Sequence, residues 1–239
     1  MYVVEERLAA EERVFPFTFP FLPHFDLSLD QPVTFFVGEN GSGKSTLLEA
    51  IADLCGFQIG GGAAHDLYEQ HERHSRLGRV LRPRFRHRPR DGWFFRAETL
   101  VNFATLLEKR KDDPDFLGDP YKYYGGKSLH LRSHGEAFLE VFKQRIHEGL
   151  FLVDEPEAAL SPQRQLSLMY LLHERAKRGG AQFIIATHSP ILLTFPGAVI
   201  IDFDDPLLPP IKLQQTKHYQ ITRGILERPE RYWTFDETE

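Results

Sequence analysis

The sequence predicts an α/β fold in which a mostly parallel sheet is covered by helices on both faces. Short continuous apolar runs are typical of strands that are buried on both sides, and four occur at 33–37, 149–153, 183–186 and 199–202. Apolar residues at helical spacing lie between these runs. A glycine-rich loop also joins the first run to a helix, which gives a strand–loop–helix unit.

The N-terminal part is expected to add two antiparallel strands, at 13–19 and 25–29, as a side layer on the sheet. A proline-containing turn separates them. The helix that follows the glycine-rich loop is expected at 46–54.

The middle of the chain predicts a small helical lobe with one basic strand. From Arg82 to Arg90 arginine alternates with other residues, so an extended strand would place these arginines on one face. A strand end is expected at 93–96, a helix at 97–109 and a loop at 111–127.

Two helices are expected in the second half of the chain, and one in the tail. Apolar residues at helical spacing predict the first from Ala137 to Ile146. The second begins at Ser161-Pro162, because proline suits the first helical position, and Gly179 is its stop. A short helix at 219–226 is expected in the tail.

The 239 residues are expected to form a single domain of two lobes. Lobe I comprises approximately 1–55 and 148–210, and lobe II, with the arginine-rich strand, comprises 56–147. Residues 211–239 form a C-terminal tail.

The composition is that of an ordinary globular protein, with 41% hydrophobic and 26% charged residues. No apolar stretch approaches the ~20 residues of a membrane span, and the acidic N-terminus does not resemble a signal peptide. Cys55 is the single cysteine, so disulfides play no part. The cytoplasm is the expected location.

The charge is distributed unevenly along the chain. Its formal net charge is −5, yet Arg73–Arg90 holds eight arginines and no acid. This segment is suited to attract nucleic-acid phosphates. It is equally suited to pair with acidic residues of the rest of the protein or of a partner protein.

The segment Gly38-Glu39-Asn40-Gly41-Ser42-Gly43-Lys44-Ser45 fits the pattern Gly-x-x-x-x-Gly-Lys-Ser of a phosphate-binding loop. Backbone N–H groups of such a loop surround the phosphates of a nucleotide, and its lysine reaches the β- and γ-phosphates. The serine hydroxyl is a ligand for Mg²⁺. The candidate nucleotide-binding residues here are Gly38, Asn40, Gly41, Ser42, Gly43, Lys44, Ser45 and Thr46.

Two acids, Asp154 and Glu155, end the apolar run at 149–153. With a phosphate-binding loop in the same chain, we expect Asp154 to hold Mg²⁺ near Ser45. Glu155 is the candidate general base that polarises the attacking water. His188 follows the next apolar run, at the edge where ligands of parallel sheets bind, and is the candidate contact to the γ-phosphate.

A further candidate is Ser133-His134-Gly135-Glu136, which precedes an apolar helix. Ser-x-x-Glu at this place is a capping box. Capping does not account for Gly135, because glycine is a poor residue for the first turn of a helix. A helix N-terminus without bulky side chains is well suited to approach a phosphate, so Ser133, Gly135 and Glu136 are candidate nucleotide contacts.

In this order, these motifs resemble those of the ATP-binding cassette (ABC) ATPases. They correspond to the Walker A motif (38–45), the signature motif (133–136), the Walker B motif (151–155), the D-loop (159–161) and the switch histidine (His188). The signature ends in glutamate, which looks more like the SMC and RecF side of the superfamily than like transporter cassettes. The segments Phe94–Glu98 and His218–Gln220 are similar to those of compact, stand-alone bacterial ATPases of the AAA/ABC type.

The resemblance implies an ATPase that uses ATP and Mg²⁺ and works as an ATP-dependent, head-to-tail homodimer. One copy would supply Lys44, Ser45, Asp154, Glu155 and His188. The other would supply Ser133, Gly135 and its helix N-terminus to the same γ-phosphate. Nucleic acid at Arg73–Arg90, in repair or defence, and an unknown protein partner are further expectations. The alternatives are the nucleotide-binding subunit of a transporter and a nucleotide-gated scaffold or regulator.

Two positions of the family pattern have no single clear counterpart in this chain. No glutamine occupies the region of the Q-loop, where Arg96 and Glu98 fall. Glu98 is either a contact to Mg²⁺ or its water shell, or an ordinary first-turn residue of the next helix. Phe15 and Phe17 are candidates for stacking on adenine, although a phenylalanine-rich segment is equally typical of a core.

Overall fold

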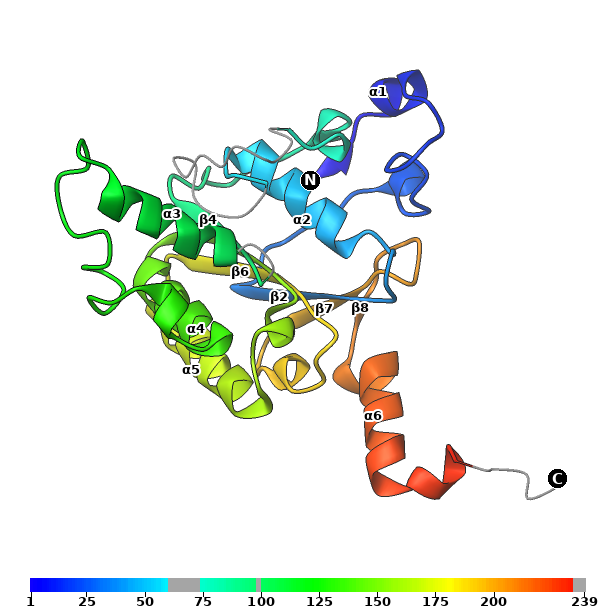
Figure 1. Cartoon of the computed structure of the whole chain (residues 1–239). Helices are drawn as coiled ribbons and strands as arrows, with labels where there is room; N and C mark the ends of the chain where they lie inside the picture. The colour runs from blue at the N-terminus through cyan, green and yellow to red at the C-terminus, as the bar shows by residue number, and fades with distance from the viewer. Residues whose placement is uncertain (60–73, 98–99, 234–239) are drawn as a thin grey trace, which may run out of the picture.

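The computed structural model describes residues 1–59, 74–97 and 100–233. Within them lies a six-stranded sheet with the order β4-β5-β6-β2-β7-β8 (Figure 1). Its first five strands are parallel neighbours, and β8 is antiparallel to β7. The mostly parallel α/β sheet is therefore confirmed. The strands are β2 (Val33–Val37), β4 (Gly92–Arg96), β5 (Gly149–Asp154), β6 (Ala181–Ala186), β7 (Val199–Asp202) and β8 (Pro210–Ile211).

Helices cover both faces of this sheet (Figure 1). Helix α2 (Lys44–Cys55) lies on one face, and α3 (Leu100–Asp112), α4 (His134–Arg145) and α5 (Pro162–Arg178) lie on the other. Neighbouring residues of a strand point to opposite faces, so Phe35 packs in the core with α4 and α5, whereas Phe36 packs in the core with α2. Burial of both faces explains why these strands are continuously apolar.

The N-terminal segment differs from the prediction. No strand forms at 13–19 or 25–29, and the small antiparallel sheet instead pairs β1 (Tyr2–Val3) with β3 (Leu81–Arg82). Helix α1 (Glu5–Ala10) follows β1. The segment from 14 to 24 contains Pro16, Pro20 and Pro23, which lack the N–H groups that a ladder needs, so it folds as turns and a short 3₁₀ helix.

The predicted arginine strand is also shorter than expected. It ends at Arg82, and residues 83–91 are irregular, with Pro83 and Pro89 among them. The arginines do not all lie on one strand face. Arg73 lies outside the described residues.

The remaining elements lie close to their predicted places. Helix α5 begins at Pro162 and ends before Gly179, whose φ is 77°. Helix α3 covers the part of the helix predicted at 97–109 that follows residues 98–99, which lie outside the described residues. Helix α6 (Lys217–Glu227) covers the helix expected in the tail. The division into two lobes stays a prediction. Among the described helices, none is both long enough and apolar enough to cross a membrane.

Candidate nucleotide-binding site

The predicted site residues meet at one edge of the sheet. Strands β2, β5 and β6 are parallel neighbours, so their carboxyl ends lie side by side. These ends continue into the phosphate-binding loop, into Asp154-Glu155 and into Thr187-His188. The register pairs Asp154 and Phe36 with the same residue, Ala186, which brings the three segments together.

The backbone of the phosphate-binding loop requires its glycines. Gly38, Gly41 and Gly43 have φ values of 145°, 82° and 102°, where other L-residues are strained. A Cβ on Gly43 would also lie 2.9 Å from the Phe21 ring. The loop leads into α2 at Lys44, where unpaired N–H groups and the helix dipole favour an anion.

Lys44 is held inside this loop with only 4% of its surface exposed. Its ammonium donates to the carbonyls of Gly38 and Glu39 at 2.8 and 2.9 Å. Burial lowers the pKa of Lys44, against the opposing effect of nearby carboxylates, of which Glu155 is the strongest. A buried cation at a helix N-terminus is suited to bind a polyphosphate.

Asp154 and Ser45 form the candidate Mg²⁺ site. The Ser45 hydroxyl donates to Asp154 Oδ1 at 2.9 Å. Burial raises the pKa of Asp154 to about 6, although Arg96 and Ser45 act in the opposite direction. A hydroxyl and a carboxylate are hard oxygen ligands, and Mg²⁺ usually takes few protein ligands and completes its shell with water and substrate phosphates. The two side chains therefore fit the ion.

Arg96 shares this corner of the site, at the end of β4. Its Nη1 lies 2.7 Å from Glu49 Oε1, and its Nε lies 3.7 Å from Asp154 Oδ2. Arg96 therefore contacts the Asp154 carboxylate from the side of β4. Glu98, the other candidate there, lies outside the described residues.

Glu155 directly follows Asp154 in a left-handed backbone conformation, with φ of 46°. Such a conformation is uncommon for a residue other than glycine and is concentrated at functional sites. The turn directs its half-exposed carboxylate toward His188, whose Nε2 lies 3.5 Å from Glu155 Oε1. The two residues predicted as catalytic are therefore neighbours.

His188 is fixed by Glu157, a residue that the sequence analysis missed. The Glu157 carboxylate accepts hydrogen bonds from the Thr187 hydroxyl at 2.8 Å and from the backbone N–H of His188. Burial lowers the pKa of His188, and the Lys44 ammonium lowers it further. The imidazole is thus neutral at pH 7. No pattern in the sequence distinguishes Glu157 from a turn residue.

Comparison with known proteins agrees with this geometry. Residues 17–80 match a family model described as "AAA domain", and residues 129–194 match one described as "AAA domain, putative AbiEii toxin, Type IV TA system". The two matched segments contain the phosphate-binding loop, the signature and the Asp154–His188 region. Both models describe AAA domains, and both segments contribute to the same edge of the sheet. A search of curated proteins found no match.

Solved structures with similar folds include cbiO1 from Clostridium perfringens, part of the ABC transporter complex cbiONQ, with 18% identity and a TM-score of 0.46 over 87% of this chain and 89% of that one. An ATP-binding cassette of an ABC transporter in its ADP conformation shows 15% identity and a TM-score of 0.46 over 87% and 89%. The SMC head domain from Thermotoga maritima shows 14% identity and a TM-score of 0.42 over 78% and 92%.

The predicted signature, residues 133–136, forms the expected capping box at the start of α4. The backbone N–H of Ser133 donates to Glu136 Oε2 at 3.1 Å. Arg164 of α5 donates to the Ser133 hydroxyl and to Glu136 Oε1, both at 2.9 Å. The sequence analysis did not predict this residue. Ser133 is exposed, and its described contacts are with α4 and α5 rather than with the phosphate-binding loop.

Gly135 has a packing reason that the sequence did not reveal. It is buried, and a Cβ at this position would lie 2.8 Å from the Ala159 carbonyl oxygen and 2.7 Å from Arg164 Nη1. Only glycine lets α4 approach this turn so closely. The need for glycine therefore does not by itself indicate a phosphate contact, and the role of Gly135 toward nucleotide stays a prediction.

The two candidate adenine contacts differ in exposure. Phe17 is buried, at 8% exposed, whereas Phe15 is 63% exposed. The ring of Phe15 meets that of Phe19 edge to face at 5.5 Å, and the Phe19 ring lies beside Gly43. Of the two phenylalanines, Phe15 therefore has the free ring close to the phosphate-binding loop.

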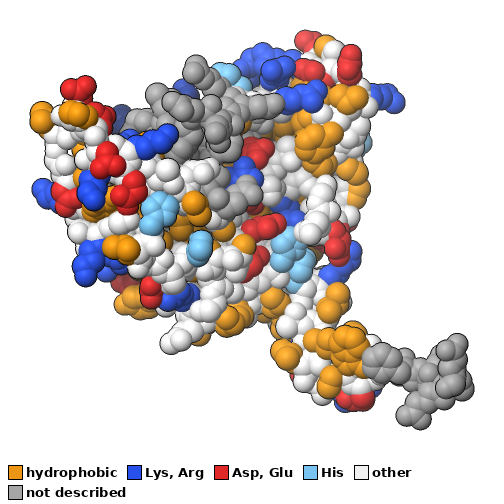
Figure 2. Space-filling view, in the orientation of Figure 1, with side chains coloured by type: hydrophobic (Ala, Val, Ile, Leu, Met, Phe, Trp, Pro, Cys, Tyr) orange, Lys and Arg blue, Asp and Glu red, His pale blue; other side chains and the backbone are white. Residues whose placement is uncertain are grey.

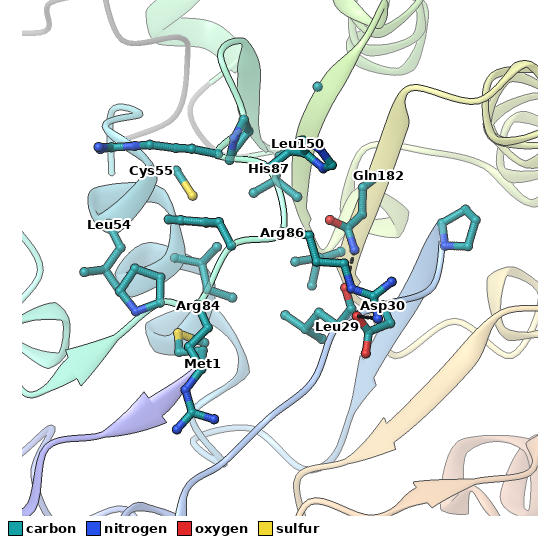
Figure 3. A pocket seen from close by; sticks show the side chains of 18 of the residues that line it. Met1, Leu29, Asp30, Leu54, Cys55, Arg84, Arg86, His87, Leu150 and Gln182 are labelled. Carbon is teal, nitrogen blue, oxygen red and sulfur yellow. Dashed lines mark hydrogen bonds and ion pairs between the residues drawn. The ribbon is translucent and has the colours of Figure 1, made fainter.

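A cavity of about 1140 Å³ lies at the opposite edge of the sheet (Figure 3). Its wall includes Pro32, Gly149 and Gln182, at or next to the amino ends of their strands, so it is not the nucleotide site. The segment after β3 supplies most of its positive charge, with Arg84, Arg86, Arg88 and Arg90. Arg86 lies 3.1 Å from Asp30, and Arg84 lies 3.7 Å from Asp26.

Proposed function

We propose that this protein binds ATP together with Mg²⁺ at the carboxyl edge of its sheet and hydrolyses the ATP to ADP and phosphate. The observation that carries the proposal is the convergence of five side chains from three strand ends: Lys44, Ser45, Asp154, Glu155 and His188. The family matches support the same activity, because they cover these segments.

Each residue has a distinct role in this proposal. The loop N–H groups and the Lys44 ammonium bind the β- and γ-phosphates. Ser45 and Asp154 hold Mg²⁺, which when bound neutralises negative charge on the phosphates. Glu155 orients the attacking water and takes its proton, and His188 donates a hydrogen bond from its neutral ring to a γ-phosphate oxygen.

We further propose that two copies associate head to tail around ATP. Ser133 is exposed at the N-terminus of α4, away from the contacts of its own phosphate-binding loop, so it is free to complete the site of a second copy. ATP would join the two copies because both bind its γ-phosphate, and hydrolysis would remove that shared group. The stability of the closed dimer then depends on how much more tightly the dimer binds ATP than ADP.

The biological role that we favour is defence. The description of the family matched at residues 129–194 names a toxin of a type IV TA system, which supports defence over repair. The arginine-lined cavity supports contact with single-stranded nucleic acid in such a role. Arg88 and Arg90 are exposed there without an ion pair among the described residues, and the partly exposed ring of Phe85 is available for stacking on a base.

Replacement of Lys44 tests the proposed activity. We expect Lys44→Ala to lose ATP binding and hydrolysis, because it removes the only ammonium inside the described loop while the loop backbone is kept. Binding of a fluorescent ATP analogue and release of phosphate are the two measurements. Lys212→Ala, on an exposed lysine distant from the loop in the sequence, is the control. Undiminished hydrolysis by Lys44→Ala would place the active site elsewhere.

A further inference from the structure

The first turn of α6 places a second histidine against His188. His188 Nδ1 lies 2.8 Å from His218 Nε2, and the ring centroids are 4.9 Å apart. On the opposite side of its ring, His188 Nε2 lies 3.5 Å from Glu155 Oε1. Figure 2 shows histidine side chains beside acidic ones where the α6 region joins the body of the molecule. His188 thus connects the predicted general base to the C-terminal helix.

Helix α6 meets the body of the protein through this first turn. It has no buried residue and projects away from the sheet (Figure 1). Thr216, which caps it, is buried, and Lys217 Nζ lies 2.9 Å from Asp204 Oδ2. The other oxygen of Asp204 accepts the N–H of Glu39, in the phosphate-binding loop, at 2.7 Å. Asp204 therefore connects the first turn of α6 to the phosphate-binding loop.

The hydrogen bond between the two imidazoles requires that one ring donates and the other accepts. Burial is the main cause that lowers the pKa of both rings, so both are neutral at pH 7.5. If His188 donated from Nδ1, its bare Nε2 lone pair would face the Glu155 carboxylate. If His218 donates, His188 Nε2 carries the proton and the contact with Glu155 is attractive.

We propose that His218 is a positioning residue for His188: it donates its Nε2–H to His188 Nδ1 and keeps the His188 proton on Nε2. That proton points to the side of the ring where Glu155 lies. For its effect on hydrolysis, the inference rests on the proposed function, since the protonated Nε2 is the nitrogen that donates to the γ-phosphate. The tautomer itself does not depend on that function.

A role in packing alone makes a different prediction. His218 and His188 meet edge to face, and phenylalanine would fill the same space. If only packing matters, His218→Phe should leave the protonation of His188 unchanged. Glutamine keeps an N–H donor at a similar reach, so His218→Gln should restore what His218→Phe removes.

The experiment measures the ring nitrogens of His188 by ¹⁵N NMR at pH 7.5 in the nucleotide-free protein, and then kcat and KM for ATP. We expect Nε2–H and bare Nδ1 in the wild type and in His218→Gln. In His218→Phe we expect a mixture of tautomers and a kcat lower by about tenfold, with KM little changed. Tyr219→Phe, on the same helix turn, is the control for folding of α6.

An unchanged His188 tautomer in His218→Phe would overturn the proposal. So would a His188 that carries its proton on Nδ1 in the wild type. The NMR measurement needs no ATPase activity, so a wild type that hydrolyses nothing would contradict the proposed function while leaving the tautomer result intact. Thermal unfolding of each variant confirms that the variants are folded.

Discussion

Three charged side chains at the carboxyl edge of the sheet are largely removed from water. Burial lowers the pKa of Lys44 and raises those of Asp154 and Glu157, so each group is shifted toward its neutral form. Residues placed for ligand binding often reduce the stability of the ligand-free fold. Bound phosphates would add negative charge beside Lys44, and bound Mg²⁺ would add positive charge beside Asp154.

The stability of Asp154→Asn tests this account. The pKa of Asp154 is raised in the folded state from 3.8 to about 6, so its ionised form destabilises the fold above pH 6. This penalty decreases as the pH falls through 6 and is absent below the unfolded value. We expect Asp154→Asn to raise the free energy of unfolding by roughly 3 kcal/mol at pH 7.5, and by little at pH 4.

Chemical denaturation without nucleotide, at both pH values, measures that effect. A variant that is less stable than the wild type at pH 7.5 would show that the contacts with Ser45 and Arg96 outweigh the cost of burial. Hydrolysis of ATP by the same variant should be lost, because a neutral amide is a poor ligand for Mg²⁺.

The sequence reveals some site residues and conceals others for a physical reason. Lys44, Ser45 and Asp154 are found because a local backbone shape fixes them directly after a strand or within a loop. Glu157, Arg164 and His218 act on partners 28 to 31 residues away in the sequence. Resemblance singles out the His218–Gln220 segment but not the partner of His218. Only the folded chain brings such pairs together, so no local pattern indicates the contacts.

Secondary structure elements, too, are predicted correctly where local signals fix them and wrongly where other residues decide. Helix α5 carries strong local signals, Pro162 at its start and Gly179 after its end, and forms where predicted. Phe15, Phe17 and Phe19 alternate as in a strand, but Pro16 between them and Pro20 after them prevent pairing. Phe17 and Phe19 are buried through turns. The alternation of hydrophobic residues alone therefore predicts a strand where the segment folds as turns.

The arginine segment after β3 provides a prediction at the scale of an element. We expect Arg88→Ala combined with Arg90→Ala to weaken binding of single-stranded DNA or RNA, since both side chains line the cavity without a described ion pair. Loss of two phosphate contacts should reduce the slope of log K against log salt concentration by about 1.4. Fluorescence anisotropy over a range of salt concentrations measures it.

The matched control for that pair is Lys177→Ala combined with Arg178→Ala, which removes the same charge from the exposed end of α5. Equal binding by both double variants and the wild type would mean that the cavity does not contact nucleic acid. Equal weakening in both would indicate a nonspecific effect of net charge.

At the scale of the whole molecule, the structure separates three surfaces. The nucleotide site lies at the carboxyl edge of the sheet, and the arginine-lined cavity lies at the amino edge (Figure 3). The exposed Ser133 at the start of α4 is the third. In the proposed dimer, Ser133, which accepts a hydrogen bond from Arg164 of its own chain, would complete the nucleotide site of a second copy.

The mass of Glu155→Gln in excess ATP and Mg²⁺ tests the central claim most directly. This variant keeps the loop, Lys44 and Asp154 but removes the general base, so ATP should persist and join two copies. Light scattering should give twice the 27.7 kDa of one chain with ATP, and one chain with ADP or when Ser133→Arg is added. A Glu155→Gln protein that binds ATP and stays at the mass of one chain would contradict the account.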